Sequence, residues 1–140
     1  MNISDFQVEV IIPTQTKYLD LIGSIGEHIG KGLENFSGDK KALAYHLNLV
    51  LTEATSNAIK HSKTKNIKDT VKINIQVFDD ELLIKVYDHG QGFDLQSVPL
   101  AVEGLAESGR GIFFIRELMD SVEYIHKDDC NVLEIRKSLK

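Results

Sequence analysis

The spacing of apolar residues predicts two helices in the first half of the chain. One helical stripe runs over Thr16–Phe36 and a second from about Asp39 to His61, with the sequence SGDK between them. The stripes are Tyr18, Ile22, Ile25, Ile29, Leu33 and Phe36, then Leu43, Leu47, Val50, Ala54 and Ala58. An apolar residue at every third or fourth position is typical of a helix with one buried face, and Asp39 is a suitable N-cap for the second helix.

Alternation of apolar and polar residues predicts strands in the remainder of the chain. The expected strands are Asp5–Pro13, Val71–Val77, Leu82–Val86, Ser121–His126 and Asn131–Leu139. A tight turn at Asp79 and Asp80 would join the second strand to the third, and a turn at Lys127–Asp129 would join the last two. The pattern therefore predicts a first strand followed later by two antiparallel hairpins.

A long glycine-rich segment, Gly90–Gly111, separates the two hairpins and ends in a short expected helix, Gly111–Asp120. The predicted order is strand, helix, helix, hairpin, loop, helix, hairpin. Helices gathered on one face of a mostly antiparallel sheet give a two-layer α+β sandwich. Loops longer than about 12–15 residues in a compact domain are usually functional or disordered, so this segment is a candidate for function.

Composition narrows the class of protein. The chain has 140 residues, of which 42% are hydrophobic and 26% charged, as expected for one ordinary globular domain spanning 1–140. A net charge of -5 argues against a nucleic-acid partner. The single cysteine, Cys130, excludes an intramolecular disulfide, and no apolar run is long enough to span a bilayer. We therefore expect a cytoplasmic protein with no membrane association.

The second predicted helix carries an unusual polar row. Glu53, Asn57 and His61 follow one another at intervals of four, which places them on one side of the helix. Such a row is usually a solvated face. Small residues beside it leave space for a ligand, and in that case Asn57 offers an oxygen suited to magnesium and Glu53 a base.

Two glycine-containing segments are ambiguous when each is taken alone. In VYDHGQGFD, Asp88 follows a strand and Gly90 and Gly92 come after it, which fits either a simple turn or a close approach to a flat ligand. In ESGRGIFF, Gly109, Arg110 and Gly111 open a helix, which fits either a flexible loop or a phosphate site.

These three segments together resemble the GHKL ATPase family, which includes DNA gyrase and the ATP-binding domains of histidine kinases. Glu53-x-x-x-Asn57 on a helix, Asp88-x-Gly90-x-Gly92 after a strand and Gly109-x-Gly111 at a helix start occur in the family's order. LVLTEATSNAIKHS, VYDHGQGFD and GRGIFFIRELMDSVEY are most similar to its small serine/threonine kinases that act as anti-sigma factors. The resemblance extends over nearly the full chain and implies the Bergerat ATP-binding fold.

The resemblance implies a role for each matching residue. Glu53 would be the catalytic base, and Asn57 would hold Mg²⁺ that bridges the ATP phosphates. Asp88 would bind the adenine amino group, with Gly90 and Gly92 forming the adenine floor. Gly109 and Gly111 would belong to the lid and the phosphate-binding turn, with Arg110 as a further phosphate contact. Lys60 and His61 match the end of the helical motif without an assigned chemical step, and Leu95–Gly109 would be a mobile lid.

The resemblance also implies the partners. A histidine kinase needs a preceding dimerisation helix pair, and gyrase-like machines need a following transducer domain. The sequence contains neither, so we expect a kinase whose substrate is another protein. In the resembling subfamily the substrate is a STAS-domain anti-anti-sigma protein, the competing partner is a sigma factor, and homodimers are usual. Two alternatives stay open: a nucleotide-dependent binding module without phosphoryl transfer, and the same kinase with a regulatory target other than a sigma factor.

Overall fold

The structure, a computed structural model, describes residues 6–34, 36–62, 69–89, 107–127 and 130–140. Its elements in chain order are β1 (Phe6–Pro13), the 3-10 turn η1 (Thr16–Tyr18), α1 (Leu19–Gly32), α2 (Lys40–His61), β2 (Thr70–Val77), β3 (Glu81–Asp88), α3 (Glu107–Leu118), β4 (Ser121–His126) and β5 (Asn131–Ser138). The strands form one sheet in the order β1-β2-β3-β5-β4. Each described pairing is antiparallel.

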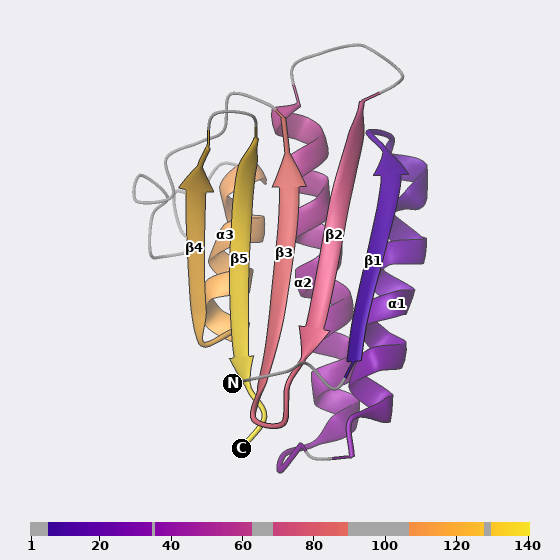
Figure 1. The fold of residues 1–140 in the computed structure, drawn as a ribbon, viewed down its shortest axis with the longest axis vertical. Helices are drawn as coiled ribbons and strands as arrows, with labels where there is room; N and C mark the ends of the chain where they lie inside the picture. The colour runs from indigo at the N-terminus through magenta and orange to yellow at the C-terminus, as the bar shows by residue number, and fades with distance from the viewer. Residues whose placement is uncertain (1–5, 35, 63–68, 90–106, 128–129) are drawn as a thin grey trace.

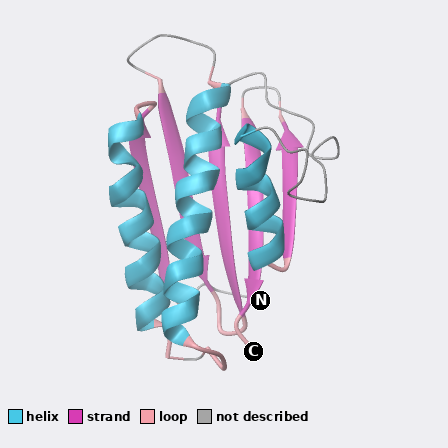
Figure 2. Ribbon diagram, turned by 180° about the vertical axis from the view of Figure 1, so that it is seen from behind, coloured by secondary structure: helices cyan, strands magenta, loops and turns pink. Residues whose placement is uncertain are grey.

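The molecule has two layers, with α1, α2 and α3 lying side by side on the same face of the sheet (Figures 1 and 2). The predicted fold class, a two-layer α+β sandwich with helices on one face, is confirmed. Both hairpins form where the alternation predicts them, and the Phe78 N–H donates to the Glu81 carbonyl across the first turn. No helix in the described ranges combines the length and apolarity needed to cross a membrane.

The second helix begins where its capping residue predicts. The Asp39 side chain accepts hydrogen bonds from the backbone N–H groups of Lys41 and Ala42, at 2.9 and 3.4 Å. These bonds satisfy two of the donors that a helix start leaves without intrahelical partners. The cap fixes where α2 begins, and the apolar stripe that packs on the core sets which side of the helix carries the polar row.

The first helix is shorter than the predicted Thr16–Phe36. It starts with the single turn η1 and ends at Gly32, because Leu33 has extended backbone angles, φ -78° and ψ 100°. Leu33 and Phe36 still pack against the core. The apolar spacing therefore continues past the end of the helix, and it could not indicate where the helix stops.

The two long helices approach each other closely along buried glycines of α1. A Cβ built on Gly30 would lie 2.7 and 2.8 Å from the Cα and N atoms of Ala44, which belong to the α2 backbone and cannot move aside alone. We expect Gly30→Ala to lower the free energy of unfolding by about 1–3 kcal/mol, as overpacked cores usually do. Chemical denaturation of the native protein and the variant measures the difference.

Gly32 provides the matched control for this prediction. It lies in the same helix, and a Cβ at that position would meet no atom within 4 Å. Gly32→Ala should leave the stability unchanged or raise it by up to about 1 kcal/mol, since alanine favours the helix. If both variants lost the same stability, the close packing of α1 on α2 would not explain the effect.

The core lies between the sheet and the helices. Alternate residues of β3 face it, namely Leu82, Ile84 and Val86, and the same alternation carries Asp88 to that face at the end of the strand. Asp88 is only 3% exposed. A carboxylate is therefore buried at the edge of the apolar core, on the face that the helices cover.

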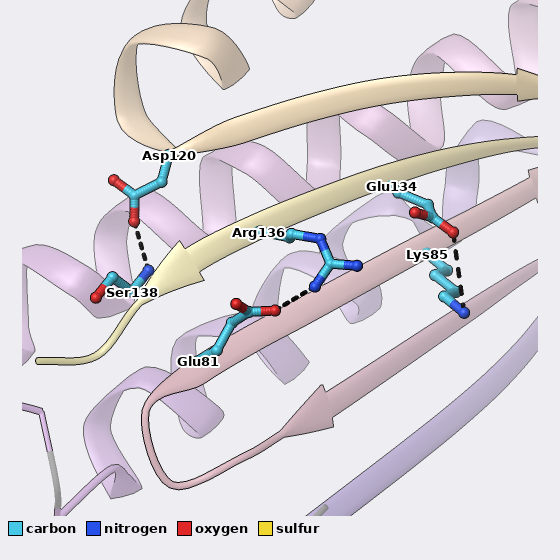
Figure 3. A network of polar contacts seen from close by, with 6 residues as sticks. All are labelled: Glu81, Lys85, Asp120, Glu134, Arg136 and Ser138. Atoms are coloured by element: carbon cyan, nitrogen blue, oxygen red, sulfur yellow. Dashed lines mark hydrogen bonds and ion pairs between the residues drawn. The ribbon is translucent and has the colours of Figure 1, made fainter. Parts of the chain in front are cut away.

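The opposite face of the sheet carries charged side-chain pairs. Figure 3 shows two pairs that bridge β3 and β5 there, Glu81 with Arg136 and Lys85 with Glu134. The Lys85 Nζ and Glu134 Oε1 atoms are 3.9 Å apart. Near the same end of the sheet, the Asp120 carboxylate accepts a hydrogen bond from the Ser138 backbone N–H. Exposed pairs of this kind contribute at most about 1 kcal/mol each to stability.

The glycine-rich segment is only partly described. Residues 90–106, which include Gly90, Gly92 and most of the expected lid Leu95–Gly109, lie outside the described residues. The prediction that the third helix begins at Gly111 is wrong, because α3 already begins at Glu107. Gly109 and Gly111 are therefore helical residues in the first turns of α3. The reason is that a glycine in a first turn is tolerated, although it resembles a loop signal in the sequence.

Candidate active site

The polar row of α2 lies at the face of the helix that meets α3 and the end of β3. Asn57 is buried, with 3% of its surface exposed, and Glu53 and His61 are half-buried. A solvated stripe would leave all three side chains exposed. The row is therefore an internal polar surface between α2 and the elements beside it.

Gly111 of α3 brings the two helices together at this row. A Cβ at Gly111 would lie 2.6 Å from Oε2 of Glu53 and 3.4 Å from Nδ2 of Asn57. The missing side chain is thus what leaves space for the Glu53 carboxylate. Gly111 therefore lies beside Glu53 and Asn57, although more than fifty positions of sequence separate it from each of them.

The Asn57 side chain has a buried polar atom that could bind a ligand. Its Nδ2 atom is buried and has no hydrogen-bond partner among the described residues. A buried polar group without a partner costs about 1–3 kcal/mol, so it usually has a reason in function. A carboxamide held in this way can bind a polar ligand that enters between the helices and the sheet.

Asp88 accepts hydrogen bonds from a residue of β5, which pairs with β3, and from a residue of β4, which pairs with β5. The Tyr124 hydroxyl donates to Oδ2 at 2.9 Å, and the Asn131 amide donates to Oδ1 at 3.0 Å. Nδ1 of His126 lies 2.9 Å from Oδ1, the side-chain oxygen, of Asn131. The register brings these residues together, because Asp88 pairs with Asn131 across β3 and β5, and Asn131 pairs with His126 across β5 and β4.

Electrostatics connect Asp88 to the α2 row. Burial lowers the pKa of His61, and the negative charge of Asp88 partly opposes that change, so the two groups act on each other across the space between helix and sheet. Burial also raises the pKa of Tyr124, and the Asp88 carboxylate raises it further. The Tyr124 hydroxyl therefore stays protonated at physiological pH and remains a hydrogen-bond donor to Asp88.

The structure places some predicted site residues and leaves others undescribed. It brings Glu53, Asn57 and Gly111 together, with Asp88 across from the end of the same α2 row. Gly90 and Gly92 lie outside the described residues, and for Gly109 and Arg110 only their place in the first turn of α3 is described. Tyr124, Asn131 and His126 were not predicted. Their one sequence signal is that each stands on the core-facing side of its strand, where apolar residues are the rule.

The fold and these residues are those of an ATP-binding domain of the histidine kinase type. The family model described as histidine kinase-like ATPase domain matches residues 29–137, so the chain belongs to that family. A solved histidine kinase domain from Erythrobacter litoralis has the same fold, with a TM-score of 0.57 at 20% identity over 91% of this chain. This chain covers 62% of that one, which is less than two thirds of its length.

Curated relatives identify a narrower group. The chain is 26% identical over 125 residues to the serine-protein kinase RsbW of Oceanobacillus iheyensis, covering 83% of this chain and 77% of that protein. It is 24% identical over 147 residues to the RsbW of Staphylococcus epidermidis, covering 95% and 87%, and 25% identical over 136 residues to that of Bacillus cereus, covering 91% and 82%. These relatives confirm the predicted resemblance to serine/threonine kinases of this family, and with it the enzyme class.

Proposed function

We propose that the protein is an ATP-dependent serine/threonine protein kinase that acts as an anti-sigma factor and phosphorylates a STAS-domain anti-anti-sigma protein. The observation that carries the proposal is the junction of α2 and α3. There Gly111 leaves space for Glu53 and Asn57, while the buried Asp88 lies across from the end of the same row. The names of the curated relatives support the choice of a protein serine as the phosphate acceptor.

Glu53 is the general base in this proposal. Its carboxylate is half-buried and lies beside the first turns of α3, where helix N–H groups favour the negative charge of the phosphates. A substrate hydroxyl that enters from the same side would donate its proton toward Glu53 as it attacks the γ-phosphate. Phosphoryl transfer depends mainly on such positioning and on charge stabilisation, with the base orienting the nucleophile.

Asn57 is the residue that would hold magnesium. The described residues contain no group of three or more His, Cys, Asp or Glu side chains arranged to bind a metal. A magnesium ion usually keeps several waters and is bound mostly by substrate phosphates, so one amide oxygen of the protein is enough to hold it. The atom of Asn57 without a partner is Nδ2, a donor that suits a phosphate oxygen, while the amide oxygen would be the ligand to the metal. When bound, magnesium neutralises charge on the phosphates.

The adenine end of the site is Asp88, with Gly90 and Gly92 next to it in the sequence as the proposed adenine floor. Gly109 and Gly111 would contact the phosphates through the backbone of α3, and Arg110 would be a further phosphate contact. Lys60 and His61 receive no chemical step. The proposal also includes a sigma factor as a second partner, a homodimer as the oligomeric state and the cytoplasm as the location, all taken from the resemblance.

Transfer of radiolabel from γ-labelled ATP to a STAS-domain protein encoded in the same organism tests the proposal. The expected result is label on a serine or threonine of that protein, dependent on magnesium. ATP binding without any labelled partner would instead favour a nucleotide-dependent binding module. Capture of partners from native cells with and without ATP, followed by mass spectrometry, identifies the target if it is not linked to a sigma factor.

A further inference from the structure

The hydrogen bonds around Asp88 have a direction that can be worked out from chemistry alone. An ionised carboxylate only accepts hydrogen bonds, so Asn131 must turn its NH₂ group toward Oδ1. The Asn131 carbonyl oxygen then faces His126, and the Nδ1 atom of His126 must carry the hydrogen. Tyr124 donates to Oδ2, and its raised pKa keeps that hydroxyl protonated. The hydrogens of this network therefore all point toward Asp88.

We propose that Tyr124 and Asn131 are positioning residues that make the site selective for 6-amino purine nucleotides over 6-oxo purine nucleotides. This inference rests on the proposed function, in which Asp88 binds the base. The two donors hold the carboxylate from two neighbouring strands, Asn131 at Oδ1 and Tyr124 at Oδ2. A carboxylate held in this orientation accepts a bond from an amino group, whereas a 6-oxo group would place oxygen against oxygen.

The fixed orientation is the source of the selectivity. Asp88 is buried, and a carboxylate that lost the Tyr124 bond could turn on its side-chain bonds. A turned carboxylate would no longer present the same lone pairs to the base, and donors of the pocket such as Asn131 would become available to a 6-oxo group. Loss of the hydroxyl should therefore weaken ATP more than it weakens ITP, which differs from ATP only in the purine ring at positions 1 and 6.

Tyr124→Phe tests this inference, because it removes only the hydroxyl. Dissociation constants for ATP and ITP, each with magnesium, are measured by calorimetry. We expect the native protein to prefer ATP, and the variant to lose about tenfold of that preference, which corresponds to about 1.4 kcal/mol. Tyr87→Phe is the matched control: Tyr87 is the neighbour of Asp88 on β3, its ring contacts Lys72, and alternation places it on the other face of the sheet.

Each outcome has a distinct meaning. A native protein that binds ATP and ITP equally would contradict the adenine assignment of the proposed function itself. A selective native protein whose Tyr124→Phe variant folds and keeps the full ATP-to-ITP ratio would overturn the inference alone. If Tyr124→Phe does not fold, Asn131→Ala decides in the same way, with a lowered ratio expected. A purely structural role would lower the melting temperature and leave the ratio unchanged.

Discussion

Glu53→Gln should slow phosphoryl transfer by about 10²–10⁴-fold, the usual loss when a general base is removed. The substitution keeps the shape of the side chain beside Gly111, where the Glu53 carboxylate now lies. ATP affinity should therefore stay nearly unchanged, because the base acts on the attacking hydroxyl and not on the bound nucleotide. Single-turnover labelling of the STAS-domain partner gives the transfer rate, and calorimetry gives the affinity.

Glu123→Gln is the control for this variant, because Glu123 is an exposed residue of β4. The Glu123→Gln protein should transfer phosphate at the native rate. A native transfer rate in Glu53→Gln would remove Glu53 from the chemistry. A large loss of ATP affinity in that variant would mean that Glu53 binds nucleotide and does not serve as the base.

Asp88→Asn should weaken ATP binding by at least about tenfold. Both carboxylate oxygens already accept hydrogen bonds, from Tyr124 and Asn131, so a carboxamide would turn an NH₂ group toward one of these donors. Bonds to a charged group contribute about 1.5–3 kcal/mol, and the bond to the adenine amino group would weaken with them. Calorimetric titration with ATP and with ITP separates the two effects, since the loss should be greater for ATP.

Asp79→Asn provides the comparison for Asp88→Asn. Asp79 lies in the turn between β2 and β3, at the other end of β3, and its carboxylate contacts Lys140 on the surface. We expect native affinity for both nucleotides in this variant. The adenine assignment would fail if Asp88→Asn bound ATP as tightly as the Asp79 variant does.

The sequence was sufficient for the type and order of the elements, because each buries one regular face. These faces are local patterns, namely the alternation in β2 and β3 and the helical stripe of α2, and the structure forms each element where its pattern predicts it. The ends were less predictable. The apolar residues Leu33 and Phe36 continue the stripe of α1 beyond Gly32, because they pack on the core although they lie past the end of the helix.

The site was predicted to the extent that it depends on motifs within one element. Glu53 and Asn57 share a helix face, and Asp88 ends a strand, so their spacing alone indicates them. Tyr124, Asn131 and His126 reach Asp88 only through the pairing of β3 with β5 and of β5 with β4. That register is a long-range property of the sheet, and no local spacing in the sequence reveals which side chains it brings together.

The most direct test of the account is an experimental structure of the protein with magnesium and a non-hydrolysable ATP analogue. We expect the adenine amino group to contact Asp88 and the metal to contact the Asn57 side chain. We also expect the γ-phosphate to lie next to Glu53 and the first turns of α3. A nucleotide bound on the face of the sheet opposite the helices, or one whose base lies away from Asp88, would contradict the proposed site.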